Sequence, residues 1–268
     1  MTVYATSLAS GSSGNALLVQ TNTTALLVDC GLPQRTIEKH LAHVGMAPAD
    51  LSAILLTHEH GDHAHSAGPL ARRYNIPIIS NIPTTNALGV ALVGVVPTML
   101  EVGDTTHIGD CTIRSFPVAH DAAAPVGYTI HADGWCVGVA TDLGSWDSTV
   151  LEALQPADLV VIEANHDLEK LRMAPYQWPV KQRIFSPLGH LDNIETANLL
   201  ARLGADGRRR TAWLAHLSEQ ANSPDIARNI VQNVLSLAEV SCIKVAVLPR
   251  RAPLHWASDE HLEQLEFF

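Results

Sequence analysis

A cluster of potential metal-binding side chains interrupts an apolar segment in the first quarter of the chain. Residues 51–56 are largely apolar and predict a buried strand, and the next seven residues, 57–63, read THEHGDH. Three histidines and two acids cannot continue into a hydrophobic core. His58 and His60 are spaced i, i+2, unlike the i, i+4 pair of a zinc-binding helix, so we predict a tight loop. Such a loop could turn His58 and His60 toward one cation and Asp62 and His63 toward a second. A solvated, histidine-rich turn is the alternative.

Several other predicted strands also end at a residue that could bind a metal or support a ligand. In layered α/β folds the loops at the carboxyl ends of the strands converge, while helices cover the faces of the sheet. Taken singly, His120 or His216 would more often be a hydrogen-bonded polar residue at a strand end. Together with the THEHGDH segment, the recurrence predicts one shared site, formed by the strand-end residues Asp29, His58, His120, Asp142, Glu163 and His216.

The rest of the chain predicts alternating strands and helices. We expect strands at 2–8, 16–20, 25–28, 51–56, 77–80, 105–108, 111–118, 126–131, 135–141, 158–162, 211–215 and 243–248. We expect helices near 33–45, 67–74, 146–154, 192–204 and 223–237. Residues 81–96 are ambiguous, and residues 168–185 have little periodicity and predict an irregular excursion.

Composition limits the class of protein. Of 268 residues, 47% are hydrophobic and 16% charged, which is enough apolar material for a large core. No linker divides the sequence, so we expect a single domain over 1–268 with a peripheral tail at about 251–268. No apolar run is long enough to span a bilayer and the N-terminus has no signal-type stretch, so we expect a cytoplasmic protein without membrane contact. The four cysteines are scattered singly, which favours free thiols over disulfides.

Candidate substrate contacts come from three segments. The net charge of −10 argues against a general nucleic-acid coat but leaves room for a local basic groove. In the excursion, Arg172, Lys181 and Arg183 are interleaved with Tyr176 and Trp178, as expected of phosphate and base-stacking contacts. The Gly/Ser-rich segment 10–15 is either a plain hairpin connection or a substrate loop, and residues 165–166 either line the groove or pack against the excursion. The predicted substrate contacts are therefore Ser13, Asn15, Asn165, His166, Lys181 and Arg183.

The segment THEHGDH resembles the signature of the metallo-β-lactamase superfamily. Six further segments resemble the YycJ/WalJ group of exonucleases, and the likeness extends from about Ser7 to Arg250. They are SGSSGN at 10–15, HDA at 120–122, PVGY at 125–128, IEANHD at 162–167, GHLDN at 189–193 and LAHLS at 214–218. More distantly, the order of Glu163, His190 and His216 is similar to tRNase Z, a metal-dependent phosphodiesterase. One departure is Asp192, where the group has a small polar residue.

The resemblance implies an α/β (α+β) fold, a four-layer αββα sandwich of two mixed β-sheets flanked by helices. It also implies two divalent metal ions: zinc is expected as bound, and manganese or iron would suit the same ligands. His190 would be a catalytic proton donor, and Asp62 would orient the nucleophile as well as bind metal. Asp29, Thr57 and Glu163 would fix the histidine tautomers, with a turn-capping role as an equal alternative for Asp29. The implied ligands are His58, His60 and His120 for the first ion, Asp62, His63 and His216 for the second, and Asp142 between them.

The hypothesis for function is a metal-dependent phosphodiester hydrolase in which a hydroxide bridging two metal ions attacks phosphorus. The resemblance points to a DNA exonuclease and alone supplies the 5′ to 3′ direction. A small-molecule phosphodiesterase or thioester hydrolase would use the same ions. A metal or redox sensor module without turnover is the alternative from a different functional class.

Overall fold

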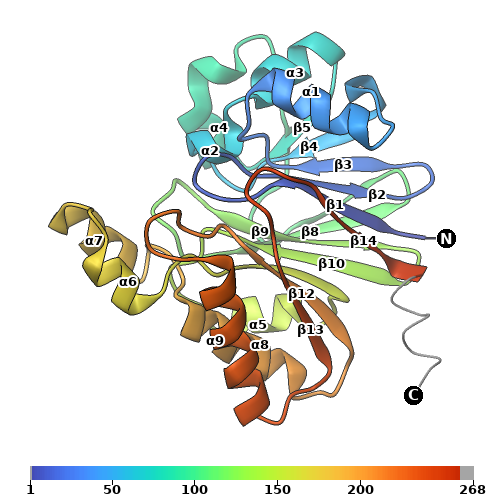
Figure 1. Ribbon diagram of the computed structural model, residues 1–268. Coiled ribbons are helices and arrows are strands. Elements are labelled where there is room, and N and C mark those ends of the chain that lie inside the picture. The colour runs from blue at the N-terminus through green and yellow to red at the C-terminus, as the bar shows by residue number, and fades with distance from the viewer. Residues whose placement is uncertain (1, 260–268) are drawn as a thin grey trace.

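The computed structural model describes residues 2–259, and its centre is a pair of facing β-sheets, each with helices on its outer side (Figure 1). The first sheet has the order β14-β1-β2-β3-β4-β5-β6. Its strands are β1 (Tyr4–Ala9), β2 (Ala16–Gln20), β3 (Ala25–Val28), β4 (Ala53–Leu55), β5 (Ile78–Ser80), β6 (Thr98–Met99) and β14 (Leu254–Ala257). The second has the order β13-β12-β11-β10-β9-β8-β7. Its strands are β7 (Thr105–Ile108), β8 (Cys111–Pro117), β9 (Val126–Ala132), β10 (Trp135–Ala140), β11 (Leu159–Glu163), β12 (Arg210–Ala215) and β13 (Ile243–Val247).

The helices complete the outer layers. Those over the first sheet are α1 (Gln34–His43), α3 (Ala67–Tyr74) and α4 (Ile82–Leu88), and those over the second are α5 (Ser148–Leu154), α8 (Asn193–Gly204) and α9 (Pro224–Leu237) (Figure 1). Shorter elements are α2 (Gly61–Ala64), α6 (Leu168–Met173), α7 (Trp178–Phe185) and the 3₁₀ turns η1 (Pro48–Asp50) and η2 (Gly89–Leu92). The predicted sandwich of two mixed sheets flanked by helices is confirmed.

Most central strands are buried on both faces. In β3, Leu26 and Val28 point into the core between the sheets, whereas Ala25 and Leu27 pack against the helical layer. A strand covered on both faces has no polar face to alternate with, so it appears in the sequence as a continuous apolar run. These apolar runs make the strands easy to recognise in the sequence. Every predicted strand and helix is found, with its ends within two residues of the prediction.

Strand register brings the site residues to one edge. In the parallel part of the second sheet, Ala140 pairs with Ile162, and Ile162 pairs with Leu214. Asp142, Glu163 and His216 therefore leave the sheet as neighbours. In the first sheet Val28 pairs with Leu55. Asp29 and the segment that begins at Thr57 therefore also leave their sheet as neighbours. The two sheets face each other, so the two sets of strand ends meet.

Three predictions need correction. Residues 168–185 are not irregular, because they form α6 and α7, which project from the sandwich (Figure 1). These helices are short, and the one fully buried residue on them is Leu171, so the sequence shows no apolar stripe. The predicted loop at 57–63 is a loop only as far as His60, since α2 begins at Gly61.

The predicted peripheral tail is the third correction. Residues 254–257 form strand β14, which pairs with β1, and Trp256 packs into the core between the sheets. The remainder of the predicted tail, 260–268, lies outside the described residues. None of the helices between residues 2 and 259 combines the length and apolar character that crossing a membrane requires.

Gly31 tests how tightly α2 is held against the end of β3. A Cβ atom on Gly31 would lie 1.6 Å from the backbone oxygen of Asp62, whereas one on Gly61 would meet nothing within 4 Å. We expect Gly31→Ala to lower the free energy of unfolding by about 3 kcal/mol or more, because backbone must move, and Gly61→Ala to lower it by less than about 1 kcal/mol. Urea denaturation of both variants measures this. Equal stability of the two would show that the packing is not needed.

Candidate metal centre

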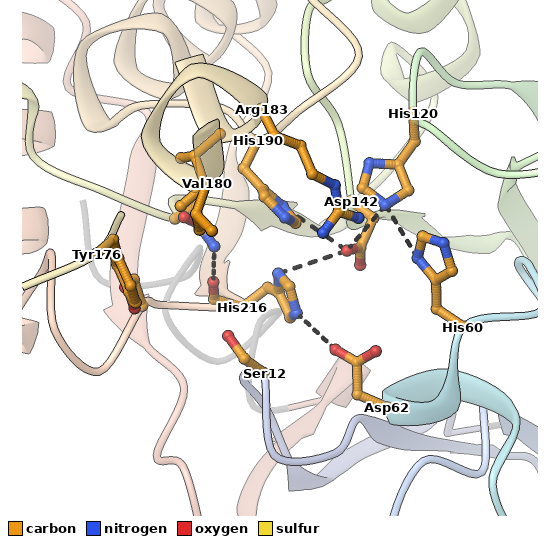
Figure 2. A pocket seen from close by; sticks show the side chains of 13 residues that line it. Ser12, His60, Asp62, His120, Asp142, Tyr176, Val180, Arg183, His190 and His216 are labelled. Carbon is orange, nitrogen blue, oxygen red and sulfur yellow. Dashed lines mark hydrogen bonds and ion pairs between the residues drawn. The ribbon is translucent and has the colours of Figure 1, made fainter. Parts of the chain in front are cut away.

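Side chains from both sheets converge on one point at this edge (Figure 2). Their potential ligand atoms form overlapping groups in which all atoms lie within 4.8 Å of one another. Three of these groups are His58 with His60 and His120, Asp62 with His63 and His216, and His58 with His63 and Asp142. This is the arrangement that the predicted assignment of two ions with Asp142 between them requires. A fourth group joins Asp142 and His216 to Glu163 and His190.

Buried atoms inside the cluster lack hydrogen-bond partners. Within the described residues, His58 Nε2 and Asp142 Oδ2 are buried without one. Asp142 Oδ2 lies 2.8 Å from His63 Nε2, but the two atoms do not have hydrogen-bond geometry. Leaving such atoms unsatisfied is costly, and a shared cation would satisfy them. The residues present therefore fit a metal.

The outer ring nitrogens are held by acceptors, which turns the other nitrogen of each ring inward. His63 Nδ1 lies 2.7 Å from Asp29 Oδ2, and His216 Nδ1 lies 2.8 Å from Glu163 Oε1. His120 Nδ1 lies 2.9 Å from the carbonyl oxygen of Gly189. Acceptors of this kind fix the tautomer of a metal-binding imidazole and raise its basicity.

Thr57 links two of these supports. Its hydroxyl lies 3.0 Å from His58 Nδ1 and donates to Asp29 Oδ2 at 2.9 Å. The backbone N–H of Thr57 donates to Asp29 Oδ1 at 2.9 Å. Asp29, Thr57 and Glu163 thus lie where the predicted supporting role needs them. The capping alternative for Asp29 finds no support, because the backbone N–H groups of Cys30 and Gly31 donate to the carbonyl oxygens of His63 and Asn15.

Three residues of the centre adopt left-handed backbone conformations. The φ angles are 63° at Asp29, 52° at Asp142 and 54° at His216. Each such residue costs on the order of 1–3 kcal/mol, which the surrounding structure must offset. Each of the three lies within two residues of the end of a buried strand. The left-handed conformation turns the chain there, so the strand stays in the sheet while the following side chain reaches the cluster.

The charges of the cluster are strongly coupled. Burial by itself would lower the pKa of His216, but Asp142, Asp62 and Glu163 outweigh it and raise the pKa to about 10. Burial would raise the pKa of Glu163, but His190 and His216 hold it at about 2. Burial, together with His63, keeps the pKa of His58 well below its usual value. Without a cation the carboxylates hold protons on histidines, and a metal would replace those protons.

The centre opens into a pocket of about 290 Å³. Besides His60, Asp62, His120, Asp142, His190 and His216, its lining comprises Ser12, Asn165, Tyr176, Val180, Arg183, Ile184 and Ser218. Arg183 reaches it from α7 and forms an ion pair with Asp121 (Figure 2 labels Arg183). Of the predicted substrate contacts, Asn165 and Arg183 line this pocket.

The other four predicted substrate contacts lie elsewhere. Ser13 is exposed beside the pocket, and its neighbour Ser12 takes the lining position. Asn15 is buried and holds its own loop, since Oδ1 accepts from Gly11 N at 2.8 Å. Lys181 donates to the carbonyl oxygen of Arg172 at 2.5 Å. His166 lines a second hollow.

The predicted site residues did not include Asp121 and Ser218, whereas Tyr176, expected among the base-stacking contacts, does line the pocket. Asp121 follows His120 directly, so its proximity could have been read from the sequence. Tyr176 lies in the segment that was predicted to be irregular, and its hydroxyl lies 3.3 Å from Ser218 Oγ.

Comparisons with known proteins agree with this geometry. Residues 24–217 match the Beta-lactamase superfamily domain. The chain is 41% identical over 239 residues to exodeoxyribonuclease WalJ of Streptococcus pneumoniae, covering 87% of this chain and 88% of that protein. It is 40% identical over 232 residues to exodeoxyribonuclease YycJ of Bacillus anthracis, covering 85% and 87%. Ribonuclease Z of Mycobacterium bovis matches 51% of this chain. Among solved structures, YhfI of Bacillus subtilis has the same fold, with a TM-score of 0.73, 20% identity, and coverage of 95% of this chain and 99% of that one.

Removal of shared ligands tests the metal assignment. We expect Asp142→Ala to reduce the bound metal from about two ions per chain to less than one, because Asp142 would contact both, and His60→Ala to lose at least the first ion. Elemental analysis of purified protein measures the stoichiometry. His65→Ala is the matched control, since His65 is exposed two residues after the THEHGDH segment and belongs to none of the ligand groups. Two ions retained in both ligand variants would refute the assignment.

Proposed function

The chain belongs to the Beta-lactamase superfamily, in the same family as exodeoxyribonuclease WalJ, and we propose that it hydrolyses phosphodiester bonds of DNA with two bound metal ions. The observation that carries the proposal is that two adjacent groups of potential metal ligands contribute to the lining of one pocket. Similarity to WalJ and YycJ, each over more than four fifths of this chain, supports DNA as the substrate.

Zinc is the metal we propose, with manganese or iron as substitutes, because the ligand set is imidazole and carboxylate without thiolate. Two divalent ions, when bound, make hydroxide available near neutral pH and offset the negative charge of the phosphate oxygens. The chain supplies the rest of the chemistry. Asp62 is partly exposed in the pocket lining and contacts His216 through Oδ2, so Oδ1 can orient the attacking water. Arg183 enters from the opposite wall and can contact a non-bridging phosphate oxygen.

His190 is placed to protonate the leaving 3′ oxygen. It lines the pocket, and its Nδ1 lies 2.8 Å from Glu163 Oε1, which leaves Nε2 free for the substrate. Burial opposes a proton on His190, but Glu163 outweighs it and raises the pKa above the usual value. A raised pKa favours the protonated ring, the form that a general acid requires.

We also propose that the protein works in the cytoplasm. All four cysteines are free, and Cys30, Cys111 and Cys136 are buried. Unpaired thiols are compatible with a reducing compartment.

The function is tested with end-labelled DNA and RNA incubated in turn with Zn²⁺, Mn²⁺ and Mg²⁺. We expect metal-dependent release of nucleotides from DNA, with 5′ to 3′ direction visible as loss of a 5′ label before a 3′ label. Cleavage of bis-(4-nitrophenyl) phosphate without cleavage of DNA or RNA would favour a small-molecule phosphodiesterase. If the metal-loaded protein cleaves none of the three, the sensor module becomes the better interpretation. His60→Ala controls for a contaminating nuclease.

His190→Ala tests the general acid. We expect bound metal to be unchanged and DNA cleavage to slow by roughly 10²- to 10⁴-fold, because the leaving alkoxide loses its proton donor. With a 4-nitrophenyl ester the loss should be much smaller, since 4-nitrophenolate leaves without protonation. Comparison of kcat for the two substrates measures this. An equal loss on both would assign His190 to positioning or metal binding instead.

A further inference from the structure

A second hollow adjoins the metal centre at His190. Its volume is about 310 Å³, at the lower end of the range for ligand pockets (roughly 300–1,000 Å³). His190 lines both hollows, so the two meet at this side chain. Helix α7 also contributes to both, with Ile184 in the first and Phe185 in the second.

Close backbone packing forms the boundary between the two hollows. The segment ending at His190 folds back on α7, since His190 N donates to Ile184 O at 3.1 Å. A Cβ atom on Gly189 would lie 2.1 Å from the oxygen of Arg183, and one on Gly144 would lie 2.5 Å from the nitrogen of Gly189. The second hollow is therefore a built cavity against the floor of the active site.

The walls of this hollow suit a flat, neutral ring. Trp146 and Phe185 line it, and base–aromatic stacking accepts every base because each has a π face. The carboxylates of Asp192 and Glu195 also line it, and they would repel a phosphate group. The part of a nucleic acid that fits here is the base.

His166 adds an unsatisfied polar group to the same hollow. Its side chain is 1% exposed, and within the described residues its Nδ1 is buried without a hydrogen-bond partner. Its ring lies edge-on to Phe185, with centroids 5.7 Å apart. Burial lowers the pKa of His166 to about 4, so the ring is neutral at pH 7 and offers one donor and one acceptor. A base edge carries matching groups.

We propose that this hollow binds the base of the nucleotide on the 5′ side of the scissile phosphate, between Trp146 and Phe185 and beside His166. The proposal rests on the proposed function, in which His190 protonates the 3′ oxygen of that nucleotide. The hollow begins at His190, so the sugar that carries the leaving oxygen lies at its mouth. Its volume admits one nucleoside, which suits an enzyme that releases single nucleotides.

Dinucleotides with one internal phosphodiester test the proposal, because they have no second cleavage site. Three substrates are compared: one with both bases, one with an abasic 5′ residue and one with an abasic 3′ residue. For the metal-loaded protein we expect loss of the 5′ base to lower kcat/KM by about 10-fold or more, and loss of the 3′ base to have a smaller effect. If none of the three is cleaved, the proposed function fails. If loss of the 5′ base changes nothing, the base pocket alone fails.

Variants link the effect to the hollow. Trp146→Ala should remove most of the difference between the substrates with and without the 5′ base, with metal content unchanged. Trp146→Phe should keep it, because stacking survives although the bond from Trp146 Nε1 to Glu195 is lost. Tyr4→Ala, at the far end of β1, is the aromatic control and should leave the difference intact. If Trp178→Ala abolishes the preference and Trp146→Ala does not, the base stacks on Trp178, which is not part of the lining, and the proposal is overturned.

Discussion

The buried carboxylate of Glu163 is the interaction on which the second sheet's half of the centre depends. Its side chain is fully buried at the end of β11, and a carboxylate there must be paired and hydrogen-bonded to be tolerated. Oε1 holds both His190 and His216, and Oε2 accepts from the backbone N–H groups of Leu143 and Leu191. The Glu163 carboxylate therefore orients the predicted ligand His216 and the predicted general acid His190. It also holds the backbone at Leu143 and Leu191.

Asp29 has the same role in the first sheet. It is buried at the end of β3 and contacts His63 and Thr57, which holds the start of the THEHGDH segment. Each sheet thus brings one buried carboxylate and the histidines that it orients. Neither half has a complete ligand set alone, because His120, Asp142 and His216 follow strands of the second sheet. The segment with His58, His60, Asp62 and His63 follows β4 of the first. The stability of the facing edges and the capacity to bind metal are therefore coupled, and a bound cation would stabilise the sandwich.

The strands and the converging residues could be predicted because both follow from local patterns, whereas the four-layer sandwich was implied by the family resemblance. Apolar runs mark strands buried on two faces, and the abrupt change to His or Asp marks where they end. Prediction from the sequence failed where contacts between residues far apart in the chain determine the structure. Strand β14 is polar at His255 and is specified by pairing with β1, about 250 residues away. Helices α6 and α7 bury too few side chains to show an apolar stripe in the sequence. Whether Lys181 lines the pocket depends on which face of α7 meets the pocket.

The distribution of charge indicates how a chain of net charge −10 could still bind DNA. Among the described residues that line the two hollows, Arg183 is the one Lys or Arg side chain, and it is already paired with Asp121. A row of cations along the backbone, the usual source of affinity for DNA, is therefore missing from both hollows. On the proposed function, affinity at these two hollows would come instead from two metal ions acting on one phosphate and from stacking of one base. Both interactions are confined to the nucleotide being cleaved, which favours attack at an end, where a single nucleotide can enter, over attack within a paired duplex.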